Sequence, residues 1–178
     1  MTSRLTRKDV ELDKKQPLYE GFLSVYKYKL KHRLFQGGWS QPIERELMER
    51  GHAVVVIPYD PVRDELVVLE QFRVGALDDP NGPWLFEFVA GMFDAGESAE
   101  EVATRELKEE AGLEAKQLIY ATSYYSSPGG TDEKLTIYIA EVDSSLAAGF
   151  GGLEEEDEDI KVHVLPRPEV IGMLDREE

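Results

Sequence analysis

Residues 91–113, GMFDAGESAEEVATRELKEEAGL, constrain the fold of this chain more than any other stretch. Ser98 is followed three residues later by Glu101, the pattern of a capping box, in which each side chain bonds a free backbone N–H at the start of a helix. Gly112 supplies the left-handed residue that commonly ends a helix. The apolar residues between these ends lie on one helical stripe, as in a helix that buries one side: Val102, Ala103 and Leu107. The stretch therefore predicts a loop, a half-buried helix and a second loop.

The acidic residues of this helix indicate a metal site. Glu106 and Glu110 are four residues apart, so both carboxylates leave one face of the helix, one turn apart. Like charges repel at this spacing, whereas hard oxygen ligands on adjacent turns suit Mg²⁺ or Mn²⁺. The alternative is a solvated acidic face, the ordinary meaning of a glutamate-rich helix. Because Glu97, Arg105 and a glycine at each end accompany these glutamates, we favour the metal site.

The spacing of nine residues in this stretch resembles the complete signature of the Nudix hydrolases: Gly91, Glu97, Arg105, Glu106, Leu107, Glu109, Glu110, Gly112 and Leu113. The resemblance implies an α+β Nudix fold, with a mixed β-sheet sandwiched between helices and an N-terminal β-hairpin arm. It also implies a loop–helix–loop that holds divalent metal against a nucleoside diphosphate linked to another moiety. Glu106, Glu109 and Glu110 would be the metal-binding cluster, and Glu97 with Arg105 a loop-holding ion pair.

The 178 residues suffice for one domain with a sizeable core and are too few for two large ones. Residues 1–17 are polar, and we expect them to be loose. Alternating polarity over 20–34 predicts a half-buried strand, and 39–48 predicts a returning strand. We expect 1–50 to form an N-terminal β arm and dimerisation region, and 51–178 to form the Nudix hydrolase domain. A simple extra hairpin on the sheet is the alternative to a dimer-forming arm.

Further strands are predicted from short apolar or alternating runs, and one helix from a proline in its first turn: strands 53–57, 66–69, 84–89, 118–125, 134–142 and 160–165, and helix 168–174. Six consecutive acidic residues, 154–159, follow a small-residue linker at 144–152. Such a run is normally a solvated, mobile loop. Because this one adjoins a strand that returns to the sheet, it can supply a carboxylate that deprotonates water, or a metal ligand.

The composition limits the partners. The net charge of −16 argues against general nucleic-acid binding, which depends on clustered Lys and Arg. The same charge repels anionic substrates, a problem that bound divalent cations solve locally. There is no cysteine, no apolar run near the roughly 20 residues that cross a membrane, and no signal peptide at the start of the sequence. We therefore expect a cytoplasmic protein with no membrane or nucleic-acid partner.

Outside the signature, the sequence is similar to one Nudix branch, the ADP-ribose pyrophosphatases, over nearly its whole length. The matching stretches are 18–22, 32–35, 49–53, 60–64, 127–131, 158–160 and 162–164. Pro128, about sixteen residues beyond the signature, marks this branch. The resemblance implies a homodimer with exchanged N-terminal arms and the adenosine between subunits. Members of this branch continue past the position of Leu174 into another apolar helix. We therefore expect this chain to be a shortened version.

The resemblance also implies individual roles. Phe22 with Leu23 of the partner subunit would stack on adenine, although an aromatic residue is common in place of this leucine. The other implied substrate contacts are Arg45, Glu46 and Arg73, with Met92, Ser127 and Glu133 along the pyrophosphate and terminal ribose. The implied magnesium ligands are the Ala90 carbonyl, Glu106, Glu110 and Glu158. Glu156 would be the general base.

The resemblance therefore implies hydrolysis of ADP-ribose to AMP and ribose 5-phosphate, with two or three Mg²⁺ ions per site and Mn²⁺ as the alternative. Within the same class, the alternative substrate is GDP-mannose or another nucleoside diphosphate sugar. From another class, the alternative is a module that binds ADP-ribose without cleaving it, although an intact set of glutamates argues against this. A calcium-binding interaction domain has only the run 154–159 in its favour, and its spacing is unlike an EF-hand.

Overall fold

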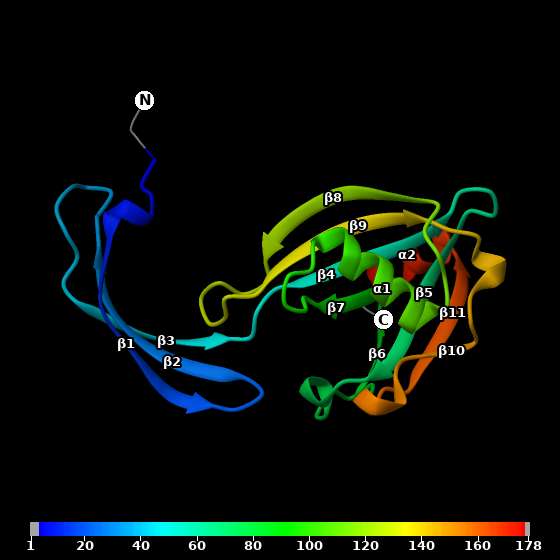
Figure 1. Ribbon diagram of the computed structural model, residues 1–178, viewed down its shortest axis with the longest axis horizontal. Helices are drawn as coiled ribbons and strands as arrows, with labels where there is room; N and C mark the ends of the chain where they lie inside the picture. The colour runs from blue at the N-terminus through cyan, green and yellow to red at the C-terminus, as the bar shows by residue number, and fades with distance from the viewer. Residues whose placement is uncertain (1–3, 177–178) are drawn as a thin grey trace. The chain divides into compact units, whose positions relative to one another are not determined.

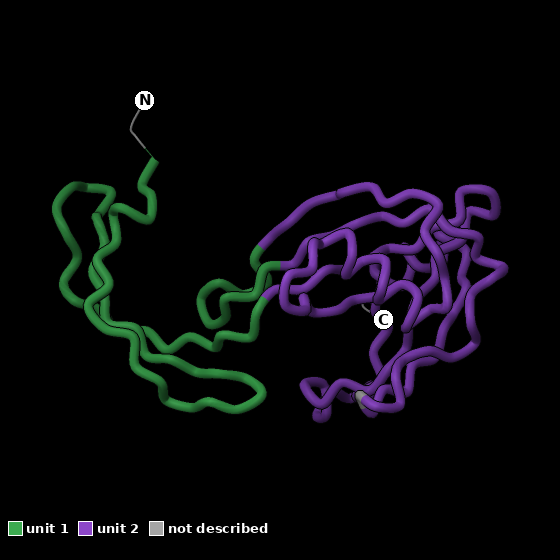
Figure 2. The backbone as a smooth tube through the Cα atoms, in the orientation of Figure 1, with its two compact units in different colours: residues 1–51, 125–134 green, residues 52–124, 135–178 purple. Residues whose placement is uncertain are grey.

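The computed structural model describes residues 4–176, and the chain divides into two compact units (Figure 2). The first unit comprises residues 1–51 and 125–134, and the second comprises residues 52–124 and 135–178. A loop from the middle of the sequence thus belongs to the first unit, an arrangement that a simple split near residue 50 does not anticipate. None of the described helices has the length and apolar character needed to span a membrane.

The first unit contains an antiparallel sheet in the order β1-β2-β3, preceded by a short 3-10 helix η1 (Arg7–Asp9). The strands are β1 (Val10–Glu20), β2 (Ser24–His32) and β3 (Ile43–Glu49). The prediction that residues 1–17 are loose is wrong for the described part, because most of β1 lies there. The expected hairpin is β2 with β3, and it is two-thirds of a three-stranded sheet. Phe22 lies in the turn between β1 and β2 rather than in a strand.

The loop 125–134 joins this sheet at the end of β3. The Met48 N–H donates to the Gly130 carbonyl at 2.9 Å, and the Asp132 N–H donates to the Met48 carbonyl at 3.2 Å. The Asp132 carboxylate accepts the Arg50 N–H at 3.0 Å. This loop is therefore held by backbone bonds to the last residues of the arm, and it is not a free connection.

The second unit is built on an eight-stranded sheet in the order β10-β11-β5-β4-β9-β8, with β6 paired to β5 and β7 paired to β4 (Figure 1). Its strands are β4 (Ala53–Asp60), β5 (Glu65–Phe72), β6 (Trp84–Glu87), β7 (Val89–Met92), β8 (Gln117–Tyr125), β9 (Lys134–Glu141), β10 (Phe150–Gly151) and β11 (Ile160–Pro166). Its helices are α1 (Ala99–Ala111) and α2 (Arg167–Arg176), with 3-10 turns η2 (Val74–Ala76), η3 (Ser144–Leu146) and η4 (Glu154–Glu156).

The central strand β4 has neighbours of both directions. It runs parallel to β9, from Ala53 opposite Leu135 to Tyr59 opposite Glu141. On its other side it pairs antiparallel with β7 over its first half and with β5 only at its end. Because β4 and β5 diverge, the expected strand 84–89 is divided into β6, which extends β5, and β7, which extends β4. The predicted mixed sheet is confirmed.

Helices cover both faces of this sheet (Figure 1), as expected for the Nudix fold. Successive residues of β5 point to opposite faces. Val67 and Leu69 pack in one cluster with Leu107 of α1. Leu66 packs in another cluster with Val170 of α2. Burial of a side chain such as Leu107, which is 0% exposed, contributes about 1.5–3 kcal/mol to folding, so α1 is fastened firmly to the sheet.

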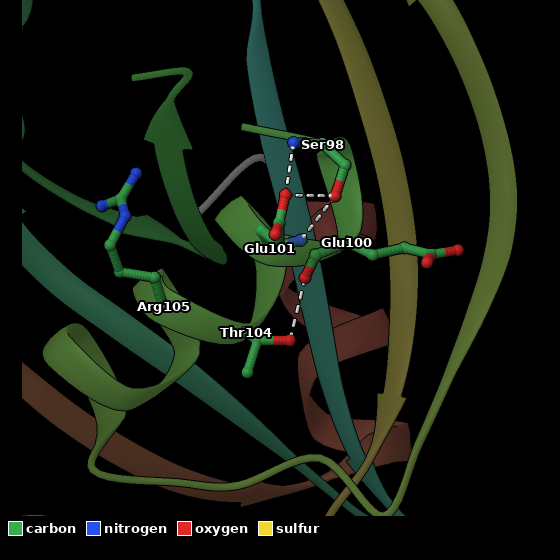
Figure 3. A pocket seen from close by; sticks show the side chains of 5 residues that line it. All are labelled: Ser98, Glu100, Glu101, Thr104 and Arg105. Atoms are coloured by element: carbon green, nitrogen blue, oxygen red, sulfur yellow. Dashed lines mark hydrogen bonds between the residues drawn. The ribbon is translucent and has the colours of Figure 1, made fainter. Parts of the chain in front are cut away.

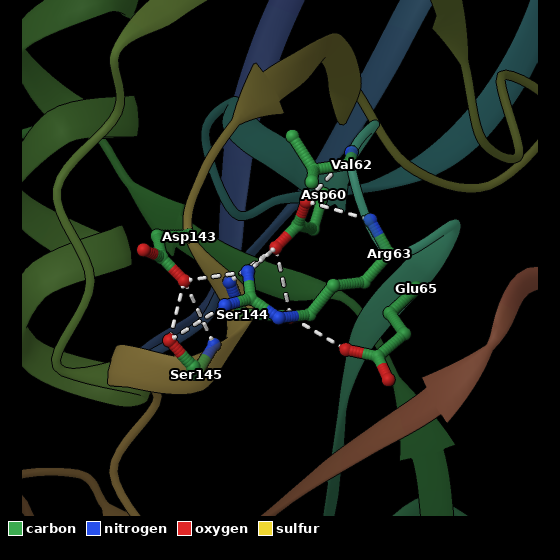
Figure 4. Close-up of polar contacts among 7 residues, drawn as sticks. All are labelled: Asp60, Val62, Arg63, Glu65, Asp143, Ser144 and Ser145. Atoms are coloured by element: carbon green, nitrogen blue, oxygen red, sulfur yellow. Dashed lines mark hydrogen bonds and ion pairs between the residues drawn. The ribbon is translucent and has the colours of Figure 1, made fainter.

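A buried carboxylate closes the turn between β4 and β5 (Figure 4). Asp60 is 1% exposed and accepts the N–H groups of Val62 at 2.8 Å and Ser144 at 3.0 Å. The Arg63 guanidinium also donates to it, at 2.6 Å. Burial by itself raises the pKa of Asp60, but these donors outweigh burial and hold its pKa well below the usual range. The network therefore fixes η3 to the turn.

Candidate active site

The predicted loop–helix–loop is present. Ser98 and Glu101 exchange capping bonds, the Ser98 N–H donating to Glu101 Oε2 at 2.8 Å and the Glu101 N–H to Ser98 Oγ at 3.3 Å (Figure 3). Arg105 extends away from these capping residues (Figure 3). Gly112 ends the helix in the left-handed region, with φ +69°. The local sequence thus determines where α1 begins and ends.

Arg105 ties the loop before α1 to the acidic face of the helix. Its Nε and Nη2 donate to the two oxygens of Glu97, each at 3.0 Å, and its Nη1 contacts Glu106 at 2.6 Å and Glu109 at 3.2 Å. Nη2 also donates to the Met92 carbonyl at 3.1 Å. These bonds, first that to Glu97, raise the pKa of Arg105. The expected ion pair is therefore present, within a wider network than the signature implies.

Gly91 makes room for Glu106. A Cβ atom at position 91 would lie 1.6 Å from the Glu106 Oε1 atom, far inside contact distance. The glycine that opens the signature therefore allows a helix carboxylate to lie against the backbone of β7.

Glu110 is the most buried acid of α1. Its side chain is 2% exposed, and its Oε2 accepts the Ala90 N–H at 2.9 Å. Burial raises the pKa of Glu110 to about 8, and the charges of Glu106 and Glu158 act in the same direction. Burial also raises the pKa of Glu106, again assisted by Glu158. The structure therefore brings these three predicted metal ligands into one electrostatic group.

Glu158 reaches this group because the expected linker packs against the end of α1. The Gly152 N–H donates to the Glu109 carbonyl at 3.1 Å. A Cβ at Gly151 would lie 1.8 Å from the Glu110 carbonyl oxygen, so the close approach requires glycine. Glu156 lies in η4 at the start of the acidic run, but its side chain lies outside the part of the structure that is described.

The acidic group has the chemistry of a divalent-cation site. Among the described residues, no three His, Asp or Glu side chains are already arranged to coordinate a metal ion. Each carboxylate faces a protein donor instead: Arg105 for Glu106, Ala90 N–H for Glu110, and Leu153 N–H for Glu158 at 3.3 Å. Carboxylate oxygens are the ligands that Mg²⁺ and Mn²⁺ prefer, and a bound cation would offset both the burial and the mutual repulsion that raise the pKa values of Glu110 and Glu106. The donor set therefore fits such an ion.

Arg73 stands beside this group and is held by an acid that the sequence analysis overlooked. Arg73 Nε donates to Glu87 Oε1 at 2.9 Å, and Nη2 donates to Oε2 at 2.8 Å. These bonds, together with the charges of Glu110 and Glu158, raise the pKa of Arg73. A single acid within the apolar strand 84–89 was the signal available in the sequence.

The remaining expected site residues are divided between the units. The second unit contains Arg73, Ala90, Met92, Glu106, Glu110, Glu156 and Glu158, and the first contains Phe22, Leu23, Arg45, Glu46, Ser127 and Glu133. Phe22 is 96% exposed, and Arg45 and Glu46 are exposed on β3. Glu133 accepts a bond from Ser126 Oγ at 2.6 Å and pairs with Arg50 at 3.2 Å.

The sequence of this chain matches the model of the NUDIX domain over residues 49–177. The chain belongs to the Nudix family. Nudix hydrolases typically use divalent metals, in agreement with the donor set of α1. The family predicted from the signature is confirmed.

Comparison with named relatives identifies the branch of the Nudix family that this chain resembles. The chain is 50% identical over 161 residues to the ADP-ribose pyrophosphatase of Escherichia coli (strain K12), covering 90% of this chain and 77% of that one. It is 46% identical over 165 residues to the ADP-ribose pyrophosphatase of Haemophilus influenzae, covering 91% and 76%. It is 32% identical over 166 residues to the GDP-mannose pyrophosphatase of Pectobacterium atrosepticum, covering 93% and 84%. The predicted resemblance to the ADP-ribose pyrophosphatase branch is confirmed.

A solved structure supports the fold alone. The crystal structure of an ADP compounds hydrolase superimposes with a TM-score of 0.70 at 23% identity, covering 98% of this chain and 86% of that one. The Nudix architecture of the sheet and helices is therefore shared with an experimentally determined protein.

Proposed function

We propose that this Nudix protein hydrolyses the pyrophosphate bond of ADP-ribose to AMP and ribose 5-phosphate. The observation that carries the proposal is the 50% identity to an ADP-ribose pyrophosphatase over 90% of the chain. The buried acids of α1 and the acid of the following loop fit the chemistry, since they form one group beside an arginine. The proposed cofactor is Mg²⁺, two or three ions per site, with Mn²⁺ as the alternative.

Four groups would hold the metal: the Ala90 carbonyl, Glu106, Glu110 and Glu158. When bound, divalent cations neutralise the diphosphate and make water a stronger nucleophile at neutral pH. The protein supplies the carboxylates and keeps them in place through Arg105, Gly91 and the glycine pair before the acidic run.

The second unit also supplies side chains for proton transfer and for binding the substrate. We assign Glu156 as the general base that takes the proton from the attacking water, because it belongs to the acidic run that carries Glu158. Arg73 is assigned to the diphosphate, since its positively charged guanidinium interacts electrostatically with Glu110 and Glu158 of the acidic group. Met92 is assigned to the same stretch of substrate.

The first unit is assigned to substrate binding across a homodimer. We propose that residues 1–50 form an exchanged dimerisation arm, 51–178 the hydrolase domain, and that Phe22 with Leu23 of the partner subunit stacks on adenine. Large apolar side chains exposed on the arm support an interface with another surface: Leu12, Leu18, Tyr19 and Phe22. Arg45, Glu46, Ser127 and Glu133 are assigned to the remaining contacts.

The test is product analysis with purified protein. ADP-ribose, GDP-mannose and diadenosine polyphosphates are incubated separately with Mg²⁺ or with a chelator, and products are separated by chromatography. We expect ADP-ribose to give AMP and ribose 5-phosphate, with Mg²⁺ only. Faster cleavage of GDP-mannose would favour the alternative that the Pectobacterium relative suggests. Binding of ADP-ribose without release of AMP would refute hydrolysis and indicate a binding module.

A further inference from the structure

The ion pair between Arg73 and Glu87 has the geometry of a fixed, two-point contact. Two edges meet: Arg73 Nε contacts Glu87 Oε1 at 2.9 Å and Oε2 at 3.1 Å, and Nη2 contacts Oε2 at 2.8 Å. A guanidinium bound through two parallel bonds is held in plane, which a single bond does not achieve. Glu87 therefore sets the orientation of this arginine. Among the described side chains Nη1 has no hydrogen-bond partner, so this edge can receive another anion.

The strands place this pair on the face of the sheet that carries α1. Glu87 is opposite Leu69 across β6 and β5, and Leu69 packs in the same cluster as Leu107 of α1. Arg73 is four residues beyond Leu69, and even spacing along an extended chain returns to the same face. The Arg73 N–H also donates to the Pro83 carbonyl at 2.7 Å, which fixes the backbone just past the end of β5.

The surroundings explain why an arginine at this point needs a partner. The hydrogen bonds to Glu87 raise the pKa of Arg73 most, and the charges of Glu110 and Glu158 act on it in the same direction. Without Glu87, the same attraction would draw a flexible cation onto those carboxylates. Glu87, on the neighbouring strand β6, binds the guanidinium instead and so restricts this movement.

We propose that Glu87 is a positioning residue, which holds the Arg73 guanidinium so that its free edge receives the diphosphate of the substrate. The inference rests on the proposed function for the identity of that diphosphate. Glu87 acts through Arg73 and does not itself touch the reacting atoms. Its loss is therefore expected to weaken substrate binding much more than the chemical step.

The experiment compares Glu87→Gln, Arg73→Ala and the double variant by steady-state kinetics on ADP-ribose. Glu87→Gln keeps the size of the side chain and removes its charge. We expect KM to rise about tenfold, the scale of one hydrogen bond to a charged group, with kcat within about threefold of wild type. In the Arg73→Ala background, Glu87→Gln is expected to change KM no further, because its effect is transmitted only by the arginine.

A matched control is available in the same unit. Asp64 forms a similar two-point pair with Arg167, at 2.6 and 2.9 Å, on the turn after β4. Asp64→Asn should leave KM unchanged, and asparagine tolerates the positive φ of 56° at this position. A rise in KM with this variant would mean that any lost ion pair loosens the site, and would refute a specific role for Glu87. An unchanged KM in Glu87→Gln, or effects that multiply in the double variant, would also overturn the proposal.

A measurement without substrate separates this proposal from the proposed function. In ¹⁵N-labelled protein, the Arg73 Nε–H is expected to exchange slowly with water, and to exchange fast in Glu87→Gln. Equal exchange in both proteins would show that Glu87 does not hold the guanidinium. If the wild type shows slow exchange but leaves ADP-ribose uncut, the proposed function fails while the positioning contact stands.

Discussion

Replacing Glu110 by glutamine is expected to make the metal-free protein more stable, even though it removes a proposed metal ligand. Burial and the neighbouring charges of Glu106 and Glu158 raise the pKa of Glu110 from 4.5 to about 8. Between these values the folded protein binds more protons than the unfolded chain. Its free energy of unfolding therefore falls as the pH rises through this window. Each pH unit between the two pKa values corresponds to about 1.4 kcal/mol of stability, so the full difference is at most about 5 kcal/mol.

Glutamine removes the titration and keeps the structure. Its side-chain oxygen can still accept the Ala90 N–H that Glu110 accepts at 2.9 Å. We therefore expect Glu110→Gln to equal wild type near pH 5 and to exceed it increasingly toward pH 9, by up to about 5 kcal/mol. Turnover should nearly disappear in the same variant. A gain in stability together with a loss of activity would show that activity is lost through the missing metal ligand and not through unfolding.

Urea denaturation in the presence of a chelator, followed by circular dichroism, measures this difference. Val102→Ala is the control, because Val102 is 0% exposed on the same helix and carries no titrating group. Its loss of stability should be similar at both ends of the pH range. The reasoning is refuted if Glu110→Gln has the same stability relative to wild type at both pH values, or is the less stable protein at high pH. Added Mg²⁺ should stabilise wild type at high pH and have little effect on Glu110→Gln.

Three further outcomes are expected. Asp60→Asn should lower the melting temperature at neutral pH and have no such effect in acid. A carboxyl with a lowered pKa stabilises the fold above its unfolded pKa, and this contribution is lost as the pH falls through its folded pKa. An equal loss of melting temperature at all pH values would contradict this. Gly151→Ala should cost about 1–3 kcal/mol in urea denaturation, since its Cβ would lie 1.8 Å from the Glu110 carbonyl oxygen, whereas Gly75→Ala meets nothing within 4 Å and should be nearly neutral. Glu156→Gln should lower kcat by roughly 10²–10⁴-fold with little change in KM; a silent Glu156→Gln beside a damaging Glu158→Gln would show that the general base is assigned wrongly.

The parts of the fold that local chemistry determines could be predicted from the sequence. The ends of α1 follow from Ser98 and Gly112, which satisfy the backbone groups of a helix without help from distant residues. The strand β1 could not be predicted in this way. Nearly all its side chains are exposed, so it carries no apolar pattern, and its pairing with β2 defines it instead. The division of 84–89 into two strands depends on the divergence of β4 and β5, which no local pattern reports.

In the site, too, the features set by local sequence could be predicted, and those set by contacts between distant segments could not. The helical spacing of Glu106 and Glu110 was sufficient to predict that they share one face, and the structure adds the mutual charge effect. The position of the acidic run predicted that it could supply a metal ligand, but the choice of Glu158 came only from the resemblance. Its approach depends on Gly151 packing against a helix about forty residues earlier, which no local pattern reports. The contact of Glu87 with Arg73 joins adjacent strands, and pairing register is invisible in a single sequence.

The placement of β4 at the centre of its sheet has a consequence for the newborn chain. Ala53–Asp60 leaves the ribosome early, but its parallel neighbour Lys134–Glu141 is made some eighty residues later, and Ile160–Pro166 must follow before β5 is flanked. Helix α1 is therefore synthesised before the surface that covers its apolar stripe is complete. Contacts so distant in sequence slow folding and prolong the exposure of sticky segments. We expect the second unit to complete its folding only after its last strand, Ile160–Pro166, has been translated.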